Sequence, residues 1–172
     1  LSFPIVATVD LDVGGSGVSG TVTLVQLDAE TLQLDYDISG IAGGTHGFHI
    51  HDSADFSNSC TSTGSHYNPA QMTHGGPSDD VRHVGDLGNI IADGNGGAVG
   101  TMFDSVAKLY GPSSVLHRAI VVHAESDDLG RGGFDDSLTT GHAGGRLACG
   151  EIKPLSFPIV ATVDLDVGGS GV

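Results

Sequence analysis

The stretch IVATVDLDVGGSGVSGTVTLVQL, residues 5–27, carries the pattern on which the fold prediction rests. Apolar and polar residues alternate before and after the segment LDVGGSGV, and a period of two is typical of half-buried β-strands. The glycines between the two runs indicate a turn. We therefore predict strands at Ile5–Asp12 and Gly17–Leu27.

The same alternation recurs along the 172-residue chain. It predicts further strands at Thr31–Ser39, Gly47–Asp52, Asp86–Ala92, Ala98–Phe103, Val115–His123 and Arg146–Ile152. No stretch has a helical period long enough for a helix. Two long segments, Ser53–Gly85 and Ala124–Gly145, are predicted to be functional loops. Eight strands with two long loops predict an all-β fold, a Greek-key β-sandwich or flattened barrel.

The net charge of −15 comes from 21 acidic residues against 6 basic ones. Such a surface is expected to repel nucleic acid and anionic membranes, which argues against both as partners. The longest apolar runs, such as Ala119–Val122, are too short to span a bilayer. The first ten residues show no signal-peptide pattern.

Residues 1–18, LSFPIVATVDLDVGGSGV, recur without a change as residues 155–172. We therefore expect one domain at residues 1–154, followed by a second copy of its first strand. Three origins fit the repeat: one unit of a tandem array, an engineered duplication, or a circularly permuted form. Because the copies have not diverged, a recent tandem array or an engineered duplication is favoured, and the tandem array is the first choice. Since two copies cannot occupy one place in a sheet, one must be displaced, disordered or inserted into a neighbouring molecule.

The chain has two cysteines, Cys60 and Cys149. They can be free core thiols, or they can join a loop rich in serine, asparagine and threonine to the strand-like segment RLACGEI. The disulfide is favoured. In the chain-entropy model it would stabilise the fold by roughly 3–5 kcal/mol.

Six histidines and one aspartate are spaced as in a site for two metal ions: His49, His51, His66, His74, His83, Asp86 and His123. His49 and His51 leave the same face of a strand, so they can bind one ion together. The set from His66 to Asp86 offers three nitrogens and one oxygen, which suits tetrahedral zinc in a closed structural site. His123 ends an apolar strand and is placed to reach the His49–His51 pair.

Each of these motifs alone would be weak evidence, because most such histidines bind no metal. Together they resemble the signature segments of Cu,Zn superoxide dismutases over roughly residues 5–153. The segments are GFHIHD, GSHYNP, THGGP, RHVGDLGN, VVHAESDDLG and AGGRLACGEI.

The resemblance implies two metal cofactors, copper and zinc. Copper would be held by His49, His51, His66 and His123. Zinc would be held by His66, His74, His83 and Asp86, so that His66 bridges the two metals. The implied reaction converts superoxide to dioxygen and hydrogen peroxide by cycling between Cu(II) and Cu(I), with His66 carrying one of the protons.

The resemblance also implies roles around the metals. Arg146 would attract and orient superoxide over the open copper face, and it can tie down the loop backbone as well. Asp127 would link a copper histidine to a zinc histidine. His46 would form hydrogen bonds near the copper strand, and Thr140 would narrow the channel.

The enzyme is favoured over a non-catalytic metal-binding or structural repeat module, because a decayed site would have lost ligands or Arg146. A copper-only dismutase is disfavoured, since the zinc set and the long loop are both present. One departure concerns the steering of substrate: Glu125 and Thr139 stand where many eukaryotic members have lysines, although Arg131 is retained. We therefore expect weaker electrostatic steering.

A second departure concerns assembly. The apolar dimer patch of eukaryotic members corresponds here to Ser53, His117 and Glu151, and a carboxylate in such a patch is costly to desolvate. The usual homodimer is therefore not expected. His117 and His142 match no ligand position. The acidic surface, the scarcity of lysine and the predicted disulfide favour an extracellular location over a cytoplasmic one.

Overall fold

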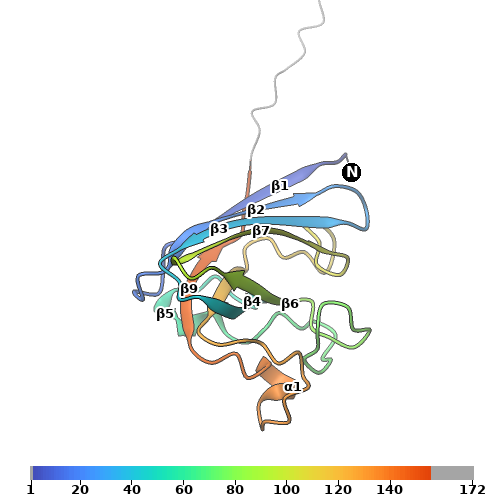
Figure 1. Cartoon of the computed structure of the whole chain (residues 1–172). Helices are drawn as coiled ribbons and strands as arrows, with labels where there is room; N and C mark the ends of the chain where they lie inside the picture. The colour runs from blue at the N-terminus through green and yellow to red at the C-terminus, as the bar shows by residue number, and fades with distance from the viewer. Residues whose placement is uncertain (1, 156–172) are drawn as a thin grey trace, which may run out of the picture.

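The computed structural model describes residues 2–155, and the strands within this part form two antiparallel sheets. The five-stranded sheet has the order β10 (Lys153–Pro154), β1 (Ile5–Leu11), β2 (Ser19–Gln26), β3 (Leu32–Ser39) and β7 (Gly97–Asp104). The four-stranded sheet has the order β6 (Asp86–Ala92), β4 (Gly44–His51), β8 (Ala119–His123) and β9 (Arg146–Glu151). Figure 1 shows the two sheets as the layers of a sandwich. The predicted all-β fold is confirmed.

The core lies between the sheets and follows the alternation seen in the sequence. In β1, Ala7, Val9 and Leu11 are fully buried while Asp10 between them is exposed. All five residues of β8 are buried, which fits a strand covered on both faces. Removing such apolar side chains from water is the main favourable contribution to folding.

The two long loops are present, but each contains a short element that the alternation does not predict. The first holds β5 (Ser57–Cys60) and the single turn η1 (Thr61–Thr63), and the second holds the one-turn helix α1 (Ser137–Thr140). The prediction that strand structure begins at Val115 is wrong. The chain turns there, with a hydrogen bond from Arg118 N to Val115 O, and β8 begins only at Ala119.

The two long loops meet each other outside the sheets. The backbone N of His74 in the first loop donates to the carbonyl of Leu138 in α1, at 2.9 Å. Cys60 and Cys149 form a disulfide, so β5 is joined covalently to β9 and the predicted bridge is confirmed.

The first copy of the duplicated segment forms β1, whereas the second copy lies outside the described residues apart from Leu155. Among residues 2–155, no helix is long and apolar enough to cross a membrane.

Candidate metal centre

Two groups of four buried donors lie side by side at the junction of β4, β8 and the two long loops. We call them the tetrahistidine group, made up of His49, His51, His66 and His123, and the histidine–aspartate group, made up of His66, His74, His83 and Asp86. Within each group the donor atoms lie within 4.8 Å of one another. These are the two sets that the sequence predicts, and they share His66.

The strands β4 and β8 determine where three histidines of the tetrahistidine group point. His49 and His51 alternate with Ile50 on β4 and so leave the same face, and β8 runs beside them with His123 at its end. The Nε2 atoms of His51 and His123 face each other at 3.3 Å. The ring of His66 lies 4.0 Å from that of His49, centroid to centroid.

Hydrogen bonds select which nitrogen each of these rings turns inward. His51 Nδ1 lies 2.9 Å from the carbonyl of Gly64, and His123 Nδ1 lies 3.3 Å from the carbonyl of Gly144. Both rings therefore present Nε2 to the centre of the group. His49 does the reverse, because its Nε2 contacts Asp127 Oδ2 at 2.8 Å and leaves Nδ1 inward.

The histidine–aspartate group converges on a single oxygen. Asp86 Oδ1 lies 2.8 Å from His66 Nδ1, and 3.0 Å from both His74 Nδ1 and His83 Nδ1. The other carboxylate oxygen accepts hydrogen bonds from the backbone N of Gly75 and of His83. The loop backbone therefore fixes Asp86 with Oδ1 toward the three rings.

Asp127 connects the two groups through the ring nitrogens that are turned away from them. Its two oxygens contact His49 Nε2 and His74 Nε2, each at 2.8 Å. Asn89 on β6 holds its backbone on both sides, because Asn89 Oδ1 accepts from Asp127 N at 2.7 Å and Asn89 Nδ2 donates to Asp127 O at 2.9 Å. Gly141 packs against the same carboxylate, and an added Cβ there would overlap both Asp127 and His74.

Burial keeps the tetrahistidine group neutral. Desolvation, followed by the charge of neighbouring histidines, holds the pKa of His49 and of His51 well below the ordinary value. Desolvation lowers the pKa of His123 to about 4. These rings are therefore uncharged at neutral pH, the form in which imidazole nitrogen binds a metal ion.

In the histidine–aspartate group, carboxylates raise the pKa of one histidine instead of leaving it lowered by burial. Burial opposes protonation of His74, but hydrogen bonds to Asp127 and Asp86 raise its pKa to about 9. Burial likewise works against ionisation of Asp86, yet hydrogen bonds from His66, His74 and His83 hold its pKa well below the ordinary value. Asp86 is therefore ionised, the form in which a carboxylate binds a metal ion.

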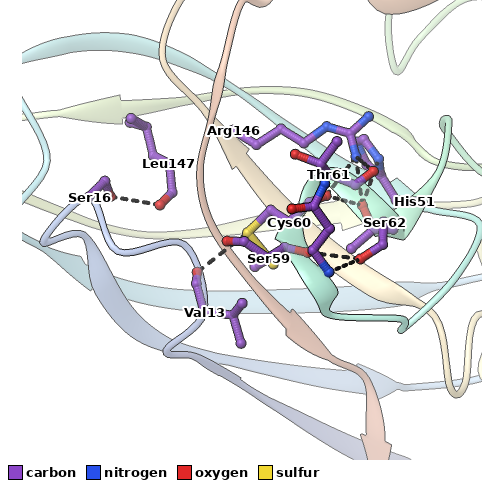
Figure 2. The surroundings of a disulfide bond; sticks show 12 residues. Val13, Ser16, His51, Ser59, Cys60, Thr61, Ser62, Arg146 and Leu147 are labelled. Carbon is purple, nitrogen blue, oxygen red and sulfur yellow. Dashed lines mark hydrogen bonds between the residues drawn. A yellow bond between two sulfur atoms is a disulfide. The ribbon is translucent and has the colours of Figure 1, made fainter.

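A pocket of about 360 Å³ opens onto the tetrahistidine group and is lined by His51, Ser65, His66, His123, Asp136, Thr140, Gly144 and Arg146. The guanidinium of Arg146 is held by the loop that follows β5. Its Nη1 donates to Cys60 O at 2.7 Å and to Thr63 Oγ1 at 2.9 Å, and its Nη2 donates to Gly64 O at 2.7 Å. Figure 2 shows Arg146 reaching over this loop beside His51 and the disulfide.

The family model for copper/zinc superoxide dismutase (SODC) matches residues 18–152, which is more than half of the chain. The chain belongs to this family. The match begins at the end of the β1–β2 loop, so β1 itself lies outside it.

The copper and zinc of this family fit the residues present. Two buried ring nitrogens, His49 Nδ1 and His66 Nε2, make no hydrogen bond with the described part of the protein. Buried polar atoms without partners are unfavourable unless a ligand satisfies them. The two unpaired nitrogens of His49 and His66 belong to the tetrahistidine group, whose imidazole ligands suit copper. The three nitrogens and one oxygen of the histidine–aspartate group suit zinc.

The remaining residues predicted for the site lie as follows. His46 contacts the carbonyls of His123 and Ala42, each at 2.9 Å, and contributes no atom to either donor group. Thr140 lines the pocket. His142 lies in the second loop, where it contacts Asp136 at 2.7 Å.

Two supporting residues were missed by sequence reasoning. Asn89 closes the predicted motif RHVGDLGN, so its position was marked although its partner was not. Arg82 opens the same motif and is buried, with its guanidinium 2.7 Å from Asp104 on β7. It also donates to the carbonyls of Pro77 and His83, which fixes the backbone of the histidine–aspartate group.

Proposed function

We propose that this chain is a superoxide dismutase with a redox copper and a structural zinc. The observation that carries the proposal is the position of Arg146. A fixed guanidinium stands at the same open pocket as His51, His66 and His123, whereas the histidine–aspartate group is closed by protein. A small anion can reach the first group, and it meets a positive donor there.

Copper, when bound by the tetrahistidine group, supplies the one-electron chemistry that oxidises one superoxide to dioxygen and reduces the next to hydrogen peroxide. The second superoxide takes up two protons. Nε2 of His66 faces this group and has no hydrogen-bond partner among residues 2–155, so it is suited to carry one of them. Arg146 keeps its positive charge throughout and orients the anion by hydrogen bonds.

Asp127, His46 and Thr140 position other groups and take no direct part in the reaction. Asp127 orients His49 and His74 by contacting the nitrogen that each turns away from its metal, as carboxylates around metal sites do. The ring of His46 on β4 connects the carbonyl of His123, at the end of β8, to the carbonyl of Ala42. Thr140 limits the width of the pocket. Zinc would hold the shared ring of His66 in place and needs no redox step.

Long-range steering of superoxide is weak in this account. Arg131, the basic residue retained in the second loop, is paired with Asp79 at 2.7 Å, so its charge is largely compensated. Glu125 packs close to Gly144 at the pocket, and Asp136 lines the pocket wall. Arg146 is therefore the positive group left to attract the substrate locally.

We further propose that the chain does not form the usual eukaryotic-type dimer. Glu151 at the end of β9 contacts the exposed His117, at 2.9 Å, in the region that would have to be apolar. A carboxylate is costly to remove from water, so covering it would oppose association. The disulfide and the acidic surface support an extracellular location.

Arg146→Ala tests the function against a metal-binding module without catalysis. The loss of a charge-assisted hydrogen bond to the anion is expected to lower kcat/KM about 10- to 100-fold. The copper and zinc contents should stay as in the parent, because Arg146 touches no donor atom. Dismutation followed by pulse radiolysis and metal analysis of the same sample measure both. An unchanged rate would contradict the role of Arg146, and a parent that binds both metals without any dismutation would support the module.

A further inference from the structure

Strand β1 lies in a slot that the rest of the domain forms around it. It pairs antiparallel with β2 over Ile5–Leu11, and with β10 on its other side at Ala7 and Thr8. Figure 1 shows β1 beside β2 in the upper sheet. The inward side chains of β1 are fully buried. The slot is therefore bounded by β2 and β10, and the hydrophobic core lies beneath it.

The loop after β1 is docked as well. Val13 exchanges two backbone hydrogen bonds with Cys149, and Ser16 Oγ donates to Leu147 O at 2.6 Å. Figure 2 shows Val13 and Ser16 at these positions beside the disulfide. Val18, just before β2, is buried again. Residues 5–18 thus bind the rest of the domain as one continuous segment.

The duplicated sequence contains this whole segment. Residues 159–172 repeat residues 5–18, so the counterparts of the buried Val9, Leu11 and Val18 are Val163, Leu165 and Val172. Residues 159–172 therefore carry the same residues as the whole docked segment, residues 5–18.

The second copy also starts beside the slot. β10 runs antiparallel to β1, and Leu155 N donates to Val6 O at 2.9 Å. Ile159, the counterpart of Ile5, follows Leu155 after three residues. Connections of two to five residues are common in β-hairpins, so the chain can turn back there and run along β10 in the direction of β1. Such a short connection gives the copy an effective concentration in the millimolar range.

We propose that residues 159–172 are a second occupant of the β1 slot in the same chain, in exchange with residues 5–18. When they occupy it, residues 19–172 form a circularly permuted version of the domain. The contacts of the two occupants are identical, because their sequences are identical. Only the connections differ: the first copy is tied to β2 and the second to β10.

Aspartate at matched core positions tests the proposal in the full chain. Leu11→Asp disables the first copy and Leu165→Asp the second, because an unpaired carboxylate is excluded from the core. Each single variant should melt within about 2 °C of the parent, since the other copy takes the slot. The double variant should melt at least about 10 °C lower or fail to fold. Leu27→Asp, at a half-exposed position outside the repeat, is the control for the substitution itself.

Proteolysis and particle mass locate the occupant. In Leu11→Asp a broad-specificity protease should remove residues from the amino terminus and leave residues 155–172 attached. Light scattering should give the same mass as for the parent, because the exchange lies within one chain. The proposal is overturned if Leu11→Asp is as unstable as the double variant, or if it folds only as a larger assembly. Neither measurement depends on dismutase activity, so this test and that of the proposed function fail separately.

Discussion

At the scale of single residues, His66 determines how the two donor groups are related. Its Nδ1 faces Asp86 Oδ1 and its Nε2 faces the tetrahistidine group, so one ring serves both groups. Asp127 makes a second connection on the far side, between His49 and His74. The two groups are thus joined through one imidazole and one carboxylate, and the position of each ring depends on its neighbours.

Asp127→Ala is expected to weaken both metal sites. Without the carboxylate, His49 and His74 lose the contact that selects their inward nitrogen, and comparable losses lower metal affinity about 10- to 100-fold. Competition with chelators of known affinity measures copper and zinc separately. Asp135→Ala, an exposed residue of the same loop, is the control. Affinities equal to those of the parent for both metals would contradict the positioning role of Asp127.

The donor residues themselves were predictable from sequence, but the inward nitrogen of each ring was not. The motif GFHIHD places His49 and His51 on one face of a strand by alternation alone. Which nitrogen points inward depends on Asp127 and on the carbonyl of Gly64, which lie 78 and 13 residues away along the chain. Such contacts follow from the tertiary fold and leave no periodic pattern.

At the scale of elements, the histidine–aspartate group depends on how its loop is attached to the sheet. The loop lacks a regular ladder of hydrogen bonds, and Arg82 substitutes for one by binding carbonyl oxygens of Pro77 and His83. Asp104 at the end of β7 receives the guanidinium, and both side chains are only 2% exposed. This ion pair therefore links the loop to the five-stranded sheet.

Asp104→Ala is expected to destabilise the metal-free protein by about 3–5 kcal/mol, because it leaves a buried arginine unpaired. Zinc affinity should fall more than copper affinity, since the loop carries the zinc donors. Denaturant titration gives the free energy of unfolding, and chelator competition gives the affinities. Asp37→Ala, exposed on the neighbouring strand β3, should change neither quantity by a comparable amount. Equal behaviour of the two variants would refute the link.

Strands such as β1, β2 and β3 were predictable because each has one buried face, which forces apolar and polar residues to alternate. β8 is buried on both faces, and its predicted start was wrong. The short elements were not predictable. β5 spans four residues with only Cys60 buried, and α1 is a single turn held by contacts with Asp136. Elements of this length are formed by their surroundings, so local sequence alone does not indicate them.

At the scale of the whole molecule, the charge distribution differs from what fast capture of an anion requires. The net charge is −15, and the positive group at the pocket is Arg146. Attraction of superoxide, the proposed substrate, is therefore expected to be short-ranged and to be opposed at a distance by the acidic body.

The dismutation rate is accordingly expected to depend only weakly on salt. Screening acts on long-range attraction, and there is little of it here to remove. The variant carrying both Glu125→Lys and Thr139→Lys should be faster at low ionic strength and should lose this advantage as salt is added. Rates measured between about 0.01 and 1 M ionic strength cover Debye lengths from about 30 to 3 Å. A steep decline in the parent protein would contradict the weak-steering account.

The most direct test of the proposed function is the metal content of the purified protein together with its dismutation rate on the same sample. The proposed function predicts one copper and one zinc per chain, and rapid dismutation that disappears when copper is removed and returns when it is restored. Removing zinc alone should leave copper bound, but with the ring of His66 held less firmly. Full occupancy by both metals without dismutation would contradict the account.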